Sequence, residues 1–476
     1  RNLISGQMSA INVQVALLSG RNCWIAVPTS SSVAELQQAA EHVLQMPLGM
    51  LVLASGDILE PSTSLEGCNV QCGDTVTAHV RGAQLAATRF DFAKLCSNGT
   101  VVQCNSGDPS EGHRLTELPL GHVRNVQASE TAFAGICSDG SVVAWGDLHS
   151  GGDALAVQAD LCDVVCVQST QTAFAAIRKD GSVVTWGDAG GGGDSHKVQE
   201  RLREVRAIQA TQSAFAAILQ GGAVVTWGEA AAGGDSQSVQ TQLQEVTHIQ
   251  ASAHNFAALR GDGSVVAWGF ELSGVSALDV KDQLHSVRAI QATEGAFAAV
   301  RTDGSVVTWG QLEFGGSSDV VQHELRDVIQ IQASSRAFAA LRADGSIVTW
   351  GPEGWGGDCS SMQSQLYDVE HVQASERAFA AIRRDGTVVT WGDLASGGDS
   401  SAVAAQLYDV TEIQASDTAF AAVRADGAVV VWGRGFENFN GAESADEFHP
   451  VAHVQVSYRT FGAISLRDGS FLAWDP

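Results

Sequence analysis

The fold of this chain is decided by the stretch AFAAIRKDGSVVTWGD, which runs from Ala173 to Asp188. Near copies follow at a constant interval of 41 residues, and a tryptophan marks each copy. The marker residues are Trp145, Trp186, Trp227, Trp268, Trp309, Trp350, Trp391 and Trp432, and Trp474 follows the last of these after 42 residues. A degenerate copy around Cys104 extends the array to ten repeats, from about Leu85 to the C-terminus. A fixed period of this length is the signature of a repeat architecture.

Each repeat carries the signals of three short strands and one helical turn. An Asp-Gly pair such as Asp180-Gly181 lies between two apolar runs, which predicts a hairpin with a two-residue turn and positive φ angles. The preceding I-Q-A-S run predicts a third strand, and Asp194-Ser195 predicts a cap for a single helical turn. Three short strands cannot bury both faces of a sheet alone. Consecutive repeats are therefore expected to stack, with their phenylalanines and tryptophans between the sheets.

The motif A-F-A-A-I-R-x-D-G-S-V-V-T-W-G-D, followed by a glycine-bearing loop, resembles the repeat of the regulator of chromosome condensation family. The resemblance covers about four-fifths of the chain and implies a β-propeller. The short repeat is more similar to the three-stranded blades of the propeller-type β-lactamase inhibitors. Ten repeats leave open a ten-bladed ring, a seven-bladed ring with additional repeats, and an open spiral. The expected fold is therefore mainly β, with ten three-stranded repeats over residues 85–476 in a β-propeller or a propeller-like spiral.

Residues 10–81 carry a different pattern. Alternating segments at residues 12–18 and 23–27 precede a helical pattern from Ser31 to Leu44, with Ser32 as its cap, and strand-like segments then return to Val80. This order is similar to ubiquitin and implies an N-terminal ubiquitin-like β-grasp domain. The apolar recognition patch of that family would fall on Leu18, Val52 and His79, where the histidine replaces an aliphatic residue.

The conjugating diglycine of ubiquitin is not found after this segment, because the chain reads Gly82-Ala83-Gln84 and continues. We therefore expect a built-in domain and not a conjugated tag. For the recognition patch, the alternative is that this built-in β-grasp fold serves only as an interaction or capping module.

The charge balance excludes several classes of partner. The chain has 476 residues, with 53 Asp and Glu against 27 Lys and Arg and a net charge of -26. Such a charge repels a phosphate backbone, so we expect no nucleic-acid binding and favour basic protein partners or a larger complex. No apolar stretch reaches the length of a membrane span, so a soluble protein without membrane insertion is expected.

Cysteine usage favours a reducing, intracellular compartment, because the nine cysteines are an odd number spread over a long chain. The organelle stays open, since a targeting signal could precede Arg1. The pairs Cys68/Cys72 and Cys162/Cys166 lack the spacing and the histidine partners of a zinc site. We interpret them as ordinary small buried residues.

No catalytic constellation is found in the sequence. The 13 histidines are scattered and match no catalytic spacing, so we expect neither an enzyme nor a cofactor. Acidic residues at opposite ends of a six-residue loop are weak candidates for calcium: Asp147 with Asp153, Asp188 with Asp194, Glu229 with Asp235, and Asp393 with Asp399. The favoured alternative is that the second carboxylate caps the following helical turn, so no metal site is predicted.

A glutamine recurs in the I-Q-A-S strand of every repeat from the second onward. These residues are Gln127, Gln168, Gln209, Gln250, Gln291, Gln332, Gln373, Gln414 and Gln455. A polar amide in an apolar strand must be satisfied by hydrogen bonds, so the amides are expected to line a central channel or to bond the next blade. Ligand binding by these amides is the less favoured alternative.

The loops after the Trp-Gly pair vary most between repeats, and binding is concentrated in loops on a rigid scaffold. Phe270, Phe314 and Trp355 fall in three successive repeats and are predicted as anchors for a protein partner. The alternative is that each ring folds over its own blade.

The sequence favours a non-enzymatic scaffold that binds partner proteins through the loop rim of a repeat β-propeller. An accessory or adaptor subunit in ubiquitin ligation or in small-GTPase nucleotide exchange is the alternative, because related repeats occur in such proteins. Direct ligase chemistry is disfavoured, since the repeats run to Pro476 and no cysteine follows Cys359. Calcium-dependent or sugar binding by the acidic loops is a third hypothesis.

Overall fold

The structure is a computed structural model. It describes residues 10–17, 22–44, 48–53, 58–59, 63–68, 70–80, 84–88, 91–96, 99–105, 114–118, 120, 122–270, 277–435, 451–456, 461–465 and 471–474. The chain divides into two compact parts. One comprises Arg1–Gln84, Lys94–Val102 and Glu117–His122, and the other comprises Leu85–Ala93, Gln103–Thr116 and Val123–Pro476. The domain limits 10–81 and 85–476 stay predictions.

The N-terminal part contains a mixed five-stranded sheet in the order β2-β1-β5-β3-β4. Its elements are β1 (Ala10–Leu17), β2 (Asn22–Pro28), α1 (Val33–Leu44), β3 (Leu48–Leu53), β4 (Ile58–Leu59) and β5 (Thr75–Val80). Strands β1 and β5 are parallel, and the other pairs are antiparallel. The predicted order of hairpin, helix and returning strands is confirmed.

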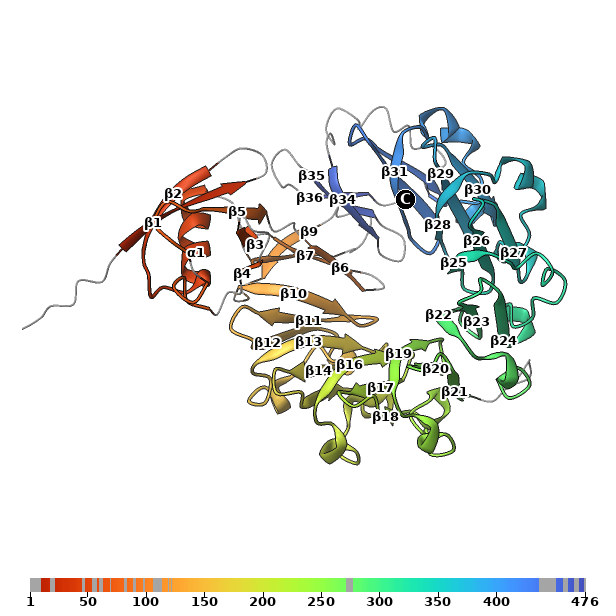
Figure 1. The fold of residues 1–476 in the computed structure, drawn as a ribbon, viewed down its shortest axis with the longest axis horizontal. Helices are drawn as coiled ribbons and strands as arrows, with labels where there is room; N and C mark the ends of the chain where they lie inside the picture. Colours follow the sequence, from red (N-terminus) through yellow and green to blue (C-terminus); the bar gives the residue numbers. More distant parts are fainter. Residues whose placement is uncertain are drawn as a thin grey trace, which may run out of the picture. The chain divides into compact units, whose positions relative to one another are not determined.

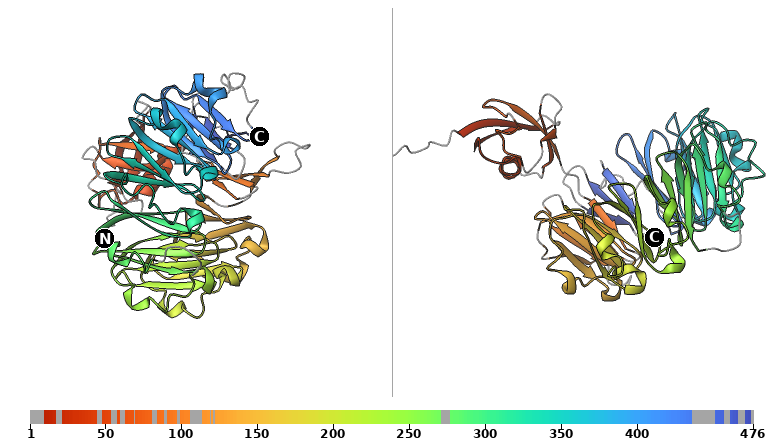
Figure 2. Two further views of the ribbon diagram at one scale, coloured as in Figure 1. Left: turned by 90° about the vertical axis from the view of Figure 1, so that its right-hand side faces the viewer. Right: turned by 60° about the horizontal axis from the view of Figure 1, so that its bottom comes forward.

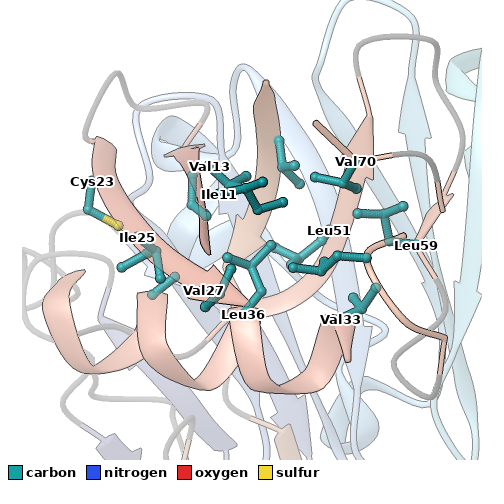
Figure 3. Close-up of a cluster of buried hydrophobic side chains, with 14 residues drawn as sticks. Ile11, Val13, Cys23, Ile25, Val27, Val33, Leu36, Leu51, Leu59 and Val70 are labelled. Carbon is teal, nitrogen blue, oxygen red and sulfur yellow. The ribbon is translucent and has the colours of Figure 1, made fainter. Parts of the chain in front are cut away.

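Helix α1 begins as the sequence predicts and covers the core of this sheet. The Glu35 amide donates to Ser32 Oγ at 3.2 Å, and the Ser32 amide donates to Glu35 Oε2 at 2.8 Å. This reciprocal pair satisfies two amides that a helix start leaves without intrahelical partners. Figure 3 shows the buried side chains between helix and sheet, among them Val13, Leu36 and Leu51.

The chain that follows the mixed sheet forms repeated small sheets, shown in Figures 1 and 2. In the described part of the chain, nine three-stranded sheets follow one four-stranded sheet, β6-β7-β8-β9. The strands of the first sheet are β6 (Gln84–Ala87), β7 (Asp91–Leu95), β8 (Val101–Asn105) and β9 (Arg114–Leu118). The prediction of three strands in every repeat is therefore wrong for the first repeat. Its sequence lacks the capped-turn pattern of the others, and Arg114–Leu118 adds a strand instead.

The later repeats share one antiparallel pattern, in which the I-Q-A-S strand pairs with the A-F-A-A strand and that strand pairs with the V-V-T-W strand. Their strands are β10 (Val123–Ala128), β11 (Ala132–Cys137), β12 (Val142–Gly146), β13 (Val164–Ser169), β14 (Ala173–Arg178), β15 (Val183–Gly187), β16 (Val205–Ala210), β17 (Ala214–Leu219), β18 (Val224–Gly228), β19 (Val246–Ala251), β20 (Asn255–Arg260), β21 (Val265–Gly269), β22 (Val287–Ala292), β23 (Ala296–Arg301), β24 (Val306–Gly310), β25 (Val328–Ala333), β26 (Phe338–Arg342), β27 (Ile347–Trp350), β28 (Val369–Ala374), β29 (Ala378–Arg383), β30 (Val388–Gly392), β31 (Val410–Ala415), β32 (Ala419–Arg424), β33 (Val429–Gly433), β34 (Val451–Val456), β35 (Phe461–Ser465) and β36 (Phe471–Trp474).

Short helical turns follow the third strand of most of these repeats. They are η1 (Leu148–Ser150), η2 (Leu155–Val157), η3 (Ala189–Gly193), η4 (Gln199–Arg201), η5 (Ala230–Ala232), η6 (Gln240–Gln242), η7 (Lys281–Gln283), η8 (Leu312–Phe314), η9 (Glu353–Trp355), η10 (Ser360–Gln365), η11 (Leu394–Ser396) and η12 (Ser401–Gln406). The predicted helical turn is confirmed, and a first turn directly after the Trp-Gly pair precedes it.

The hairpins are confirmed, but the expectation of a two-residue turn is wrong. Four residues separate the end of β14 from the start of β15, and among these four only Gly181 has a positive φ, 77°. Asp180 serves the turn through its side chain, since its Oδ1 accepts from the Ser182 amide at 2.9 Å and from the Ser182 hydroxyl at 2.6 Å. A carboxylate that closes the loop in this way removes the need for a second left-handed residue.

Consecutive sheets pack face to face, as the sequence predicts. Ala175 and Ile177 of β14 share a buried cluster with Phe215 and Trp227 of the next repeat. Within each of eight repeats the phenylalanine stacks on the tryptophan opposite it, with ring centroids 5.1 to 5.4 Å apart. The aromatic pairs therefore fill the space between neighbouring sheets, and each repeat depends on its neighbours for its core.

The glycine loop of one repeat packs against the phenylalanine of the next repeat and accepts a hydrogen bond from its tryptophan. Trp227 Nε1 donates to the Gly192 carbonyl at 3.0 Å. Gly192 has φ 98°, and a Cβ there would lie 2.7 Å from Phe215 Cδ2. Glycine is favoured at this position both by the positive φ and by the close approach of the next phenylalanine.

Candidate functional site

The ends of the I-Q-A-S strands are joined by a relay of backbone hydrogen bonds from repeat to repeat. The amide of each relay residue donates to the carbonyl of the equivalent residue in the next repeat, with seven consecutive bonds of 3.0 to 3.1 Å. The relay residues are Glu130, Gln171, Gln212, Ala253, Glu294, Ser335, Glu376 and Asp417. Together with Ala87, Thr88 and neighbouring small residues they line one cavity of about 940 Å³.

The hydroxyls in the wall of this cavity are engaged within the protein. Thr293 Oγ1 donates to the Phe314 carbonyl at 2.9 Å, and Ser375 Oγ donates to the Ser396 carbonyl at 2.9 Å. Each of these bonds ties the end of an inner strand to the loop after the Trp-Gly pair of the same repeat. The cavity wall is therefore a rigid frame that holds those loops in place.

A pair of positions beside the relay varies between repeats, and we name it the rim column. It consists of the residue after the relay residue and the fourth residue of the loop after Trp-Gly. In the described chain its pairs are Thr131/Ser150, Thr172/Gly191, Ser213/Ala232, Gly295/Phe314, Arg336/Trp355 and Arg377/Ser396. In the second repeat the pair is small and polar, since Thr131 Oγ1 donates to Ser150 Oγ at 2.7 Å.

In the later repeats the rim column holds large side chains that stack on one another. The Arg336 guanidinium carbon lies 4.6 Å from the Phe314 ring centroid and 4.4 Å from that of Trp355. The Arg377 guanidinium carbon lies 4.0 Å from the same Trp355 ring. We call Phe314, Arg336, Trp355 and Arg377 the ladder; it spans the repeats that contain β22–β24, β25–β27 and β28–β30 (Figure 1).

The ladder starts at a glycine that makes room for it. A Cβ at Gly295 would lie 2.9 Å from the Phe314 ring, so a larger side chain there would displace the ring. Phe314 therefore has Gly295 of its own repeat on one side and Arg336 of the next repeat on the other. Cation–π contacts between half-buried groups add stability to such a stack.

The structure brings two of the three predicted anchors together. Phe314 and Trp355 are half-buried and occupy equivalent positions, joined through Arg336. Phe270 is 40% exposed, lies at the position of Asp147 in its repeat, and contacts His254 edge-on with ring centroids 6.2 Å apart. Sequence reasoning missed Arg336 and Arg377, because their partners are 19 to 22 residues away and no local pattern connects them.

The paired carboxylates of the calcium hypothesis are used as caps. Asp147 Oδ1 accepts from the Ser150 amide at 3.0 Å, and Asp153 Oδ1 accepts from the Leu155 amide at 2.8 Å. The same roles recur in Asp188 and Asp194, and Asp399 accepts from the Ser401 amide at 2.8 Å while Asp393 accepts from the Ser396 hydroxyl at 2.7 Å. The second carboxylate accepts the amide two residues on, which belongs to the first residue of the following turn for Asp153 and Asp399 but lies ahead of η4 for Asp194, so the capping interpretation is confirmed in part. Among the described residues no three His, Cys, Asp or Glu side chains gather as a metal site.

The recurring glutamines have more than one role. Gln127 Nε2 donates to Ser169 Oγ of the next repeat at 3.2 Å, as expected for an amide that bonds the next blade. Gln414 Nε2 instead donates to Glu412 Oε1 of its own strand at 2.7 Å. Gln332 and Gln373 line a second cavity of about 260 Å³ with His371.

The interpretation of the cysteine pairs as buried is wrong for three of the four residues. Cys72, Cys162 and Cys166 are exposed, and Cys68 is half-buried. Cys162 lies beside Arg178, whose Nη2 donates to its sulfur at 3.2 Å. Partial burial nevertheless raises the pKa of the Cys166 thiol. The free thiols are Cys23, Cys68, Cys72, Cys96, Cys137, Cys162, Cys166 and Cys359.

The candidate patch of the N-terminal part is placed only in its backbone. Val52 pairs with Thr77 and His79 with Met50 in the β3–β5 ladder, while Leu18 and the side chains of Val52 and His79 lie outside the described residues. Over the described chain, no helix is long and apolar enough to cross a membrane.

Comparison with known proteins gives likenesses among solved structures alone. No protein-family model and no curated protein match the chain. The computationally designed protein Ika8 is 17% identical, with a TM-score of 0.31 and a match that covers 66% of this chain and 96% of the design. The CRINKLY WD40 ectodomain of the Arabidopsis thaliana receptor kinase ACR4 is 15% identical, with a TM-score of 0.31 and coverage of 56% and 93%.

A designed protein based on ubiquitin matches a smaller segment. It is 24% identical, and the match covers 16% of this chain and 93% of the design, with a TM-score of 0.15. At these scores the likenesses carry no argument about function. The chain is a mainly β protein built of repeated three-stranded antiparallel sheets beside a separate mixed sheet, and its function has to be argued from its own residues.

Proposed function

We propose that this chain is a non-enzymatic scaffold that binds partner proteins through the rim column of its repeats. One observation carries the proposal: a frame that hardly changes from repeat to repeat holds a rim position that changes from Thr172/Gly191 to Arg336/Trp355. Loops fixed by a rigid scaffold are where binding residues concentrate. Half-buried aromatic and arginine side chains are the types that dominate protein interfaces.

In this proposal the repeats are blades of a propeller or of a propeller-like spiral, similar to the regulator of chromosome condensation repeat. The relay of backbone bonds supports a radial arrangement, because equivalent strand ends line a single cavity. Hairpins in every repeat also favour blades over a β-helix.

The proposal is tested by co-purification of the tagged full chain with quantitative mass spectrometry. Phe314→Ala combined with Trp355→Ala removes both aromatic members of the ladder and should lose a partner that the native chain retains. The matched control is Leu148→Ala with Leu155→Ala, since both leucines are exposed and lie after β12 in a repeat that has no ladder residue. Equal retention of every partner by the native chain and the ladder variant would contradict the proposal.

An adaptor role in ubiquitin ligation is a second candidate, and the strand order of the N-terminal part favours it. The order β2-β1-β5-β3-β4, with β1 parallel to β5 and α1 against the sheet, supports a ubiquitin-like β-grasp domain. Deletion of residues 10–81 should then remove ligase components from the co-purified set while the partner of the ladder is kept. Unchanged recovery of ligase components after this deletion would exclude the adaptor role.

A further inference from the structure

We infer that the ladder is a docking surface for carboxylate groups of a partner polypeptide, with Arg336 and Arg377 as the receiving cations. The inference rests on the proposed function and names the chemistry of the partner at the same site. It runs against the net charge of -26, which by itself favours a basic partner.

Arg336 differs in its pairing from the arginines at the ends of the middle strands. Arginines at the ends of the middle strands pair with an aspartate two residues on, as Arg260 does with Asp262 at 3.2 Å and Arg424 with Asp426 at 2.7 Å. Among the described residues no carboxylate forms an ion pair with Arg336, and its buried Nε has no hydrogen-bond partner; Arg424 also has an unpartnered buried Nε, but its Nη2 pairs with Asp426. A guanidinium has five N–H donors, and a buried one without a partner is costly.

The stacking fixes how Arg336 can be used. Its guanidinium carbon lies within 4.6 Å of both the Phe314 and the Trp355 ring centroids, so the two rings restrict its orientation, and a further contact has to be made by the terminal Nη groups because Nε is buried. A planar N–H edge held in this way matches the two oxygens of a carboxylate. Because the rings immobilise the arginine beforehand, a partner has less side-chain entropy to overcome on binding.

Arg377 supplies a second cation on the outer face of Trp355. Its Nε lies 3.7 Å from Glu376 Oε1, which is long for a charge-assisted hydrogen bond, and its side chain is 44% exposed. The two guanidinium groups are thus separated by a single indole ring. This spacing suits two acidic side chains on one extended segment.

The charge of the whole chain decides between a carboxylate segment and a phosphate polymer. A net charge of -26 repels nucleic acids and anionic membranes at long range, whereas a short peptide with two carboxylates is repelled far less. Leu312, in the same turn as Phe314, is 59% exposed and offers an apolar contact beside the cations. The occupant is therefore an acidic peptide segment that also carries an apolar side chain.

The test uses the full chain and a short fluorescent peptide with two glutamates and one leucine, followed by anisotropy. A peptide with glutamine in place of both glutamates is the matched probe. The glutamate peptide should bind about tenfold or more tightly than the glutamine peptide, and the difference should shrink as salt increases. Equal binding of the two peptides would overturn the inference.

Variants locate the site. Arg336→Met keeps an unbranched side chain between the rings but removes the charge, and Arg377→Gln does the same on the outer face; together they should lower affinity about tenfold or more. Arg424→Met is the control, because Arg424 also lies over a ring, that of Tyr408 at 3.7 Å, yet already pairs with Asp426. An equal loss in the control, or no loss in the double variant, would contradict the assignment.

Two further readouts separate this inference from the proposed function. The co-purified partner could be lost on Phe314→Ala with Trp355→Ala but kept on Arg336→Met with Arg377→Gln. This result would support the scaffold function and refute the inference that the ladder binds carboxylate groups. A phosphoserine peptide that binds while the glutamate peptide does not would assign the cations to a phosphate instead.

Discussion

Two repeats of the chain share one frame and differ at one pair of positions. In the repeat of β13–β15 the Phe174 and Trp186 centroids are 5.2 Å apart, and in that of β25–β27 the Phe338 and Trp350 centroids are 5.1 Å apart. Their rim columns differ completely, since one has Thr172 with Gly191 and the other has Arg336 with Trp355. The difference shows that the frame constrains the aromatic pair while the rim column is free to vary.

The physical cause is the number of neighbours that each position must satisfy. Phe338 contacts the glycine loop of the preceding repeat, where a Cβ on Gly315 would lie 2.9 Å from its ring, and it also packs in the core between two sheets. A rim-column residue contacts only its own loop and one neighbour, so a matched pair such as Gly295 and Phe314 can change together. Variation is tolerated where few packing constraints meet.

The largest expected effect is the loss of a framework phenylalanine. Phe174→Ala and Phe338→Ala should each destabilise the chain locally by about 3–5 kcal/mol, because each leaves a cavity between two sheets. Hydrogen exchange of peptides from the two adjoining repeats should accelerate in both variants by a similar factor. A large effect at one site and a small effect at the other would break the equivalence of the two frames.

A methyl group on a loop glycine should have the next largest effect. Gly192→Ala and Gly356→Ala place a Cβ 2.7 Å and 2.6 Å from the next phenylalanine, at φ angles of 98° and 86°. Strain in a left-handed backbone and overpacking together should cost about 2–4 kcal/mol, measured as a fall in the denaturation midpoint. Gly354→Ala is the control, since a Cβ there has no atom within 4 Å. A control as damaging as either variant would refute the steric account.

Removal of the indole hydrogen bond should have a smaller effect. Trp227→Phe and Trp391→Phe delete donors to the Gly192 and Gly356 carbonyls, which lie 3.0 and 3.1 Å from the indole nitrogens. The expected loss is about 1–3 kcal/mol in each case, because a buried carbonyl is left without its partner. Denaturant titration of the two variants checks it, and the comparison fails if one substitution is neutral while the other is not.

The smallest expected effect is a loss of local stability in the β14–β15 turn at low pH. A hydrogen bond from the Ser182 hydroxyl, and then one from the Ser182 amide, lower the pKa of Asp180. Its stabilisation is therefore complete above the unfolded value of about 3.9 and is lost as the pH falls through the lower folded value. Exchange of the β14–β15 turn should accelerate in acid more than that of the β17–β18 turn, where Gly221 stands in place of the aspartate. Equal acceleration of hydrogen exchange in the two turns in acid would show that the Asp180 carboxylate does not stabilise its turn. The same conclusion would follow if Asp180→Asn did not accelerate exchange of the β14–β15 turn at neutral pH.

The sequence predicts the frame well because its signals are local and repeated. The Asp-Gly turns, the capped turns and the Ser32 cap depend on residues within a few positions of one another. The left-handed residue that precedes an inner strand depends on a close contact with the preceding repeat and was not predicted. Glu204 has a φ of 55°, and its Cα lies so near Gly181 of the preceding repeat that a Cβ on Gly181 would be 2.7 Å from it. Nothing in the sequence around Glu204 marks a left-handed residue.

The ladder escaped sequence reasoning for a related reason. Phe314 and Trp355 were recognisable as loop aromatics, but the rings could be placed only once the arginines beside them were known. The turn type of the hairpins was wrong because the aspartate acts through its side chain, which a backbone preference does not represent. The fourth strand of the first repeat had no counterpart elsewhere in the array.

The most direct measurement exchanges the rim columns while the frame is kept. The variant carries Phe314→Ala, Arg336→Thr, Trp355→Ser and Arg377→Thr, which copies the small, polar rim of the earlier repeats onto the later ones. Hydrogen exchange of β25–β30 and binding of the glutamate peptide are measured on the same sample. We predict that the hydrogen exchange of β25–β30 stays unchanged in this variant and that binding of the glutamate peptide is lost. Full binding of the glutamate peptide by the variant would contradict the account.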